Sequence, residues 1–206
     1  GEDYAKLAGL SAEEDLQEST KDSMKKRLPW LIILLFLGML VSSVVGVFED
    51  VVAILPIVIC FQSLVLDMAG NVGTQSLAVT IRVLMDENLS AKDKLHLTFK
   101  EAKVGFSSGL LLGMLALVFL GVYIYLFKGY SLGHAFLISS CVGASLFLAM
   151  IISSLVGTLI PLFFNKIKID PAVASGPLIT TVNDLVAVVT YYGLAWILLI
   201  EIMHIA

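Results

Sequence analysis

The chain of 206 residues is 58% hydrophobic and 15% charged, with a mean hydropathy of +0.96. It is far more apolar than an ordinary soluble domain, so the bilayer is its expected solvent and a single membrane domain is expected. The net charge of −4, with basic residues in short scattered groups, excludes a nucleic-acid partner.

The N-terminal residues 1–29 are polar and lack the ordered regions of a cleaved signal peptide, so they predict a cytoplasmic lead-in helix. Five apolar segments follow within residues 30–206, each with the roughly 20 residues that a transmembrane helix needs. The sequence therefore predicts an all-α integral membrane fold, multi-pass in the cell membrane, with an amphipathic stretch at 85–103. The predicted helices are approximately 30–48, 51–82, 104–127, 131–164 and 171–201.

The second and fifth apolar segments, 51–81 and 171–200, each contain one charged residue, Asp67 and Asp184 respectively. Cutting either segment at its aspartate would leave pieces that are mostly too short to span a bilayer, so each is expected to be one long helix. Each aspartate lies 14 to 17 residues from the flanking charged residues. At ~1.5 Å per residue this is about 21 to 26 Å, which predicts both acids near the midplane.

The basic residues predict the orientation of the chain. With the N-terminus in the cytoplasm, 12 of the 13 Lys and Arg residues fall in inside segments and only Lys128 lies outside. Cytoplasmic loops carry an excess of Lys and Arg. The N-terminus is therefore predicted inside and the C-terminus outside.

Polar and small residues accompany both aspartates at helical spacing. The i, i+3, i+4, i+7 pattern from Asp67 to Gln75 places them on one helix face, and the fifth helix repeats the design around Asp184. Two polar stripes at one depth predict a shared aqueous path. For its uncharged members, hydrogen bonding between helices explains the pattern as well as contact with an ion does. The candidate metal-contacting residues are Asp184, Asp67, Asn71, Gly70, Thr74, Thr180 and Asn183.

Small residues also recur at every fourth position of the third and fourth helices. Such spacing lets helix backbones approach closely in lipid, so these residues are predicted to pack helix against helix. They are Gly105, Gly109 and Gly113 in the third helix, and Ser145, Ala149, Ser153 and Gly157 in the fourth.

A charged aspartate at the centre of a bilayer costs at least a few kcal/mol unless water, a cation or a proton compensates it. A single acid of this kind can serve as a protonated contact between helices. Two acids at matched depth, each within a polar stripe, favour a functional role instead. Asp67 and Asp184 are therefore the leading candidates for a site.

The chain resembles the transmembrane domain of the MgtE magnesium channels, relatives of the animal solute-carrier magnesium transporters, in three motifs. These are "GNVGTQS" in the second helix, "DPAVASGPLITTVND" opening the fifth and "RLPWL" before the first. The resemblance implies a homodimer of five-helix protomers, with the pore between the second and fifth helices on the two-fold axis. It also implies that Asp184, which matches the family's pore aspartate, binds magnesium, while "GNVG" lines the path.

Two departures from the family pattern qualify the resemblance. Family members carry cytoplasmic N-terminal and CBS domains that sense magnesium, whereas 29 residues precede the first predicted helix here. That form of regulation is therefore expected to be absent or to have been cut away, which would make the chain a bare pore. The bacterial pattern usually has an uncharged residue where Asp67 stands, which suggests a second acidic ring more like that of the animal relatives.

The chemistry of the two stripes fits Mg²⁺ as the transported ion. Mg²⁺ prefers oxygen ligands and loses its water reluctantly, so a pore that offers carboxylate, amide and carbonyl oxygens can hold the hydrated ion. Two-fold symmetry would double the two acids to four carboxylates, which favour a divalent cation over a monovalent one. No Cys, His or Met cluster accompanies them in the sequence, which argues against soft metals. Channel-like transport of magnesium or other divalent cations, not enzymatic catalysis, is the predicted function.

Two alternatives remain open at this stage. A proton-coupled secondary carrier for a divalent cation would also use mid-membrane acids, which can alternate between a proton and a metal. Intramembrane aspartyl proteases place one aspartate on each of two helices at matching depth, but the sequence has neither their GxGD nor their PAL signature.

Overall fold

The computed structural model describes residues 5, 6, 8, 10, 16–85, 89–202 and 204. These residues form helices and no strand, and five of the helical stretches are long and apolar enough to cross a membrane. The predicted all-α architecture with five potential spans is therefore confirmed. The elements are α2 (Thr20–Val47), α3 (Glu49–Ile54), the 3-10 helix η1 (Pro56–Phe61), α4 (Gln62–Leu84), α5 (Ala91–Phe127), α6 (Leu132–Lys166), α7 (Pro171–Leu194) and the π-helical η2 (Ala195–Ile202).

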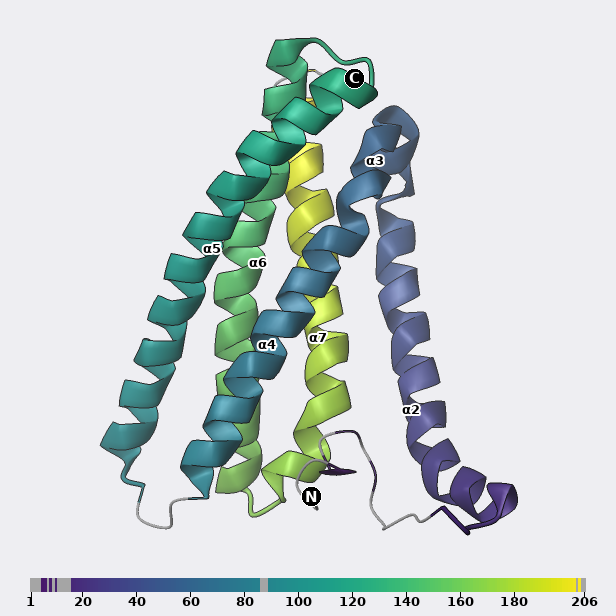
Figure 1. Cartoon of the computed structure of the whole chain (residues 1–206), viewed down its shortest axis with the longest axis vertical. Coiled ribbons are helices and arrows are strands. Elements are labelled where there is room, and N and C mark those ends of the chain that lie inside the picture. Colours follow the sequence, from purple (N-terminus) through teal and green to yellow (C-terminus); the bar gives the residue numbers. More distant parts are fainter. Residues whose placement is uncertain are drawn as a thin grey trace.

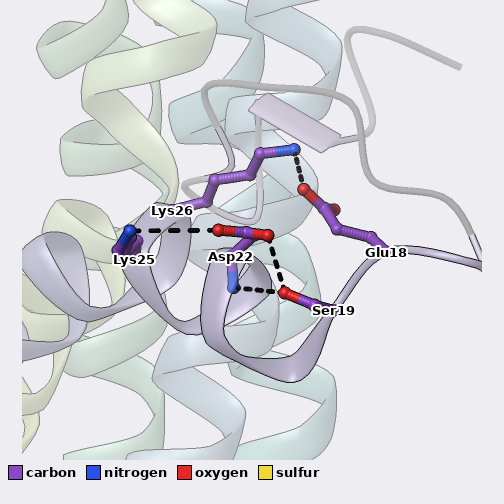
Figure 2. A network of polar contacts seen from close by, with 5 residues as sticks. All are labelled: Glu18, Ser19, Asp22, Lys25 and Lys26. Carbon is purple, nitrogen blue, oxygen red and sulfur yellow. Dashed lines mark hydrogen bonds and ion pairs between the residues drawn. The ribbon is translucent and has the colours of Figure 1, made fainter.

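Four of the long helices begin where a side chain caps the first turn. The first amides of a helix have no partner within it, and an oxygen from the preceding residue satisfies one of them. Figure 2 shows the start of α2, where the Ser19 hydroxyl accepts a hydrogen bond from the backbone amide of Asp22. Two ion pairs lie beside this cap: Asp22 with Lys25 at 3.9 Å, and Glu18 with Lys26 at 2.5 Å. The capping residues are Ser19, Ser90, Ser131 and Asp170.

Helix α6 lies at the centre of the bundle and packs against α4, α5 and α7 (Figure 1). Small residues make this close packing possible. A Cβ added at Gly113 of α5 would lie 2.7 Å from the carbonyl oxygen of Gly143 of α6, and one at Gly157 would lie 2.3 Å from that of Gly73 of α4. The prediction that Gly113 and Gly157 pack helix against helix is therefore confirmed.

Helix α2 stands at one side of the bundle (Figure 1) and packs chiefly on α7. No side chain along α2 is fully buried. Large apolar residues such as Phe36, at 63% exposed, lie open on its surface. The apolar character of α2 is thus not explained by the core of this chain, and a bilayer or another chain must cover it.

The second predicted helix differs from the observed one because it is interrupted at Leu55. Pro56 has no amide hydrogen and disfavours the α conformation for the residue before it. Leu55 accordingly has φ −131° and ψ 77°, which separates α3 from η1 and α4. The interruption lies well before Asp67, so α4 still carries the whole polar stripe.

Two other boundaries also differ from the prediction. Helix α5 begins at Ala91, not near residue 104, because Ser90 and Asp93 form a reciprocal capping box that extends the helix through the amphipathic stretch. At ~1.5 Å per residue its 37 residues measure about 55 Å, longer than the roughly 30 Å hydrocarbon core. Helix α2 begins at Thr20, so the end of the predicted lead-in helix over 1–29 is continuous with the first spanning helix; residues 1–4, 7, 9 and 11–15 of that segment lie outside the described residues.

Candidate cation site

The two aspartates Asp67 and Asp184 line one cavity, although they come from different helices. Asp67 lies on α4 and Asp184 on α7, and the cavity between them has a volume of about 480 Å³. Asp67 is exposed and Asp184 is half-buried. The cavity brings together six of the seven candidate residues: Asp67, Gly70, Asn71, Thr74, Thr180 and Asp184.

The threonines of this cavity keep their hydroxyl oxygens available as acceptors. Thr74 donates its hydroxyl hydrogen to the carbonyl oxygen of Gly70 at 2.8 Å, and Thr180 donates to that of Gly176 at 3.4 Å. A hydroxyl that donates to its own helix still has two lone pairs. The wall therefore presents hydroxyl and amide oxygens beside the two carboxylates.

A second cavity of about 550 Å³ continues along the same helices. It lies between α2, α4 and α7, and it shares Thr74, Thr180 and Asp184 with the first cavity. Its far end is bordered by Ala78 of α4 and Gly176 of α7. Asp184 thus stands at the junction of two cavities that follow one another along the α4–α7 pair.

Asn183 lines neither cavity. Its side chain is completely buried, and neither its amide nitrogen nor its amide oxygen has a hydrogen-bond partner among the described residues. It presses against α4 at Gly73, where an added Cβ would lie 1.8 Å from the Asn183 Nδ2 atom. This geometry favours contact between helices over contact with an ion, the two roles that the sequence left open.

Glu101 of α5 is a buried acid that sequence reasoning missed. It is 5% exposed, and its carboxylate accepts a hydrogen bond from the Ser76 hydroxyl of α4 at 2.8 Å. Its exposed neighbours Lys100 and Lys103 make the stretch resemble a solvated surface. The signal that could have identified it is its position four residues before Gly105, which puts it on the packed face of the helix.

Within the described residues, no group of three or more His, Cys, Asp and Glu side chains gathers around one point. The described residues of one chain therefore do not provide a site in which several charged side chains bind a metal directly. Two carboxylates among neutral oxygens can instead accept hydrogen bonds from the water shell of a cation. That arrangement suits a hydrated ion that has to leave the site again.

The amino-acid sequence of this chain is similar to those of known proteins. The family model of MgtE, described as a divalent cation transporter, matches residues 62–194. The magnesium transporter MgtE of Bacillus subtilis (strain 168) is 38% identical over 94% of this chain and 41% of its own length. That of Enterococcus faecalis is 37% identical over 94% and 40%, and that of Thermus thermophilus is 33% identical over 84% and 36%.

The chain spans about two fifths of the length of the curated relatives that it matches. The family match runs from the first residue of α4 to the last of α7, and it contains both aspartates and every other residue of the first cavity. The resemblance read from the three sequence motifs is thereby confirmed: this chain belongs to the MgtE family of divalent cation transporters.

Proposed function

We propose that this chain forms a membrane pore for Mg²⁺, in which Asp184 and Asp67 recognise the ion through its water shell. The observation that carries the proposal is that one aspartate from each of two spanning helices, α4 and α7, lines one oxygen-rich cavity. Membership of a family of divalent cation transporters supports a cation as the cargo. The relatives' name, magnesium transporter, supports Mg²⁺ among the divalent cations.

The proposed pore is completed by a second copy of the chain. Asp67 and Asn71 are exposed on the surface of a single chain, within the apolar span Pro56–Leu84 and at least 11 residues from either end of it. A carboxylate facing hydrocarbon there would cost several kcal/mol. A homodimer with the α4–α7 pairs facing each other removes that cost, because the polar walls then enclose water.

Magnesium uptake into liposomes tests the proposal. Vesicles that carry the purified chain and an enclosed Mg²⁺-sensitive dye are expected to take up Mg²⁺, and Asp184→Ala is expected to reduce the rate to that of empty vesicles. Asp50→Ala serves as the matched control, because Asp50 is an exposed acid of α3 that lines neither cavity. Uptake at the wild-type rate by Asp184→Ala would refute the assignment.

A proton-coupled carrier is the second candidate function. It draws on the same pair of acids, since two carboxylates in one cavity can exchange a proton for a metal ion. Repeating the uptake measurement with an imposed proton gradient separates the two mechanisms. A pore responds to the gradient only through the membrane potential, whereas a carrier is also driven by the proton gradient when the potential is held at zero.

A further inference from the structure

Glu101 is a buried carboxylate that the proposed pore does not use. It lies on α5, faces α4 and is 5% exposed. Among the described residues its polar partner is the Ser76 hydroxyl, at 2.8 Å. No Lys, Arg or His of the described chain lies in an ion pair with it. A buried acid with one neutral hydrogen bond is an incompletely compensated charge.

The surroundings of Glu101 are hollow, and six of the thirteen residues that line them, Glu101 included, bear a side-chain oxygen. A cavity of about 390 Å³ opens between α4, α5 and α6, and Glu101 forms part of its wall. The oxygen-bearing residues that join it there are Asn71, Gln75, Ser76, Ser108 and Ser154. Asp67 and Asp184 do not line this cavity, but Asn71 borders both it and the first cavity.

The size of the cavity fits a hydrated divalent cation. Six waters at about 30 Å³ each occupy about 180 Å³, which the cavity accommodates. Mg²⁺ commonly binds proteins through one or two carboxylates and keeps several waters. One carboxylate with amide and hydroxyl acceptors around it supplies that kind of site.

We infer that the cavity between α4, α5 and α6 is a second divalent-cation site, separate from the aspartate pair. Glu101 supplies the charge, and the amide oxygens of Asn71 and Gln75 accept hydrogen bonds from the waters of the ion. Because Asn71 borders both cavities, an ion held here lies beside the proposed path without blocking it. Only the choice of Mg²⁺ as the natural ion rests on the proposed function.

Mn²⁺ binding to the purified full chain tests the site, with the loss of the free-ion electron paramagnetic resonance signal as the readout. In an Asp67→Asn/Asp184→Asn background, one Mn²⁺ per chain is expected to remain bound and to be displaced by Mg²⁺. Adding Glu101→Gln is expected to remove this binding, because glutamine keeps the shape but not the charge. Glu49→Gln, which neutralises an exposed acid of α3, should leave it intact.

Two results would overturn the inference: no Mn²⁺ bound in the double-aspartate background, or binding that survives Glu101→Gln. The first means that the cavity is empty of cations, and the second means that Glu101 is protonated or only structural. If Glu101→Gln does not fold, as judged by helix content and thermal melting, Gln75→Leu takes its place. Gln75 is exposed, and its replacement is expected to weaken Mn²⁺ binding at least about threefold; unchanged affinity would count against the site.

The test also separates this site from the proposed pore. Mn²⁺ binding that depends on Glu101, in a chain that transports no Mg²⁺, would refute the pore and keep the site. Transport that depends on Asp184, without Glu101-dependent binding, would refute the site and keep the pore.

Discussion

Asp67 and Asp184 share a cavity but differ in exposure, so their removal should have different effects. Asp184 is half-buried at the junction of two cavities, whereas Asp67 is exposed and borders only the first. Asp67 is therefore expected to concentrate ions near the path, and Asp184 to hold them within it.

Asp67→Asn is expected to raise the Mg²⁺ concentration for half-maximal uptake at least about thirtyfold, with the maximal rate largely kept. An ion separated from a carboxylate by one water layer, about 4 Å, loses at least about 1 kcal/mol of attraction per unit charge when that carboxylate is neutralised. Concentration-dependent uptake in liposomes measures the effect. Complete loss of uptake at saturating Mg²⁺ would show instead that Asp67 is as essential as Asp184.

Gly73→Ala is expected to destabilise the protein by about 1–3 kcal/mol, because the new methyl group would lie 1.8 Å from the Asn183 Nδ2 atom. Adding Asn183→Ala should recover part of the loss, since it removes both the clash and an unpaired buried amide. Thermal melting in detergent measures both changes. Gly70→Ala is the matched control, because nothing lies within 4 Å of its added Cβ; equal losses at the two glycines would contradict the argument.

Helical periodicity was sufficient to group Asp67, Gly70, Asn71 and Thr74, which line one cavity along α4. It did not hold for Gln75, which lines the cavity between α4, α5 and α6 instead. Periodicity could not predict what the Asn183 side chain contacts, because that depends on where α4 passes beside α7. The spacing of Glu101 from Gly105 puts it on the packed face of its helix, but its hydrogen-bond partner Ser76 lies on another helix and could not be identified from the sequence.

At the level of elements, the approach of α5 to α6 depends on a pair of facing glycines. Cβ atoms added at Gly113 and Gly143 would lie 2.7 Å and 2.6 Å from the partner's carbonyl oxygen. The backbone cannot move aside as the end of a flexible side chain could. The two helices must therefore separate if either glycine gains a side chain.

Gly143→Ala is accordingly expected to lower the melting temperature by several degrees, through about 1–3 kcal/mol of overpacking. Gly133→Ala on the same helix should be neutral or stabilising, since nothing lies within 4 Å of its added Cβ and alanine favours a helix. Thermal melting of the two variants side by side gives the comparison. If the two variants have the same melting temperature, the contact between the two glycines does not limit helix packing.

The number and type of the spanning elements could be read from apolar length, but their ends could not. Residues 51–81 carry no charged residue apart from Asp67, yet Pro56 divides them. The divided segment is held in place by distant residues: Tyr191 donates a hydrogen bond to the carbonyl oxygen of Val58, and Tyr192 donates to Gln62 Oε1. Such contacts depend on the fold and leave no local trace in the sequence.

For the whole molecule, the described chain forms a bundle whose polar wall is not closed. Exposed Asp67 and Asn71 lie on the α4 side, and α2 contributes no buried residue. A membrane protein cannot leave mid-membrane carboxylates against lipid without a large cost. Closure by a second copy is therefore the expected state in the bilayer.

Cysteine cross-linking tests this closure. Ser63 is exposed and lines the first cavity, so a cysteine at this position should face its counterpart across the two-fold axis. In a background with Cys60→Ser and Cys141→Ala, Ser63→Cys is expected to give disulfide-linked dimers in membranes under mild oxidation. Phe119→Cys is the control, because Phe119 is 69% exposed on α5 and lines neither cavity. Equal cross-linking at both positions would indicate random collision, and none at Ser63→Cys would place the two-fold axis away from the aspartates.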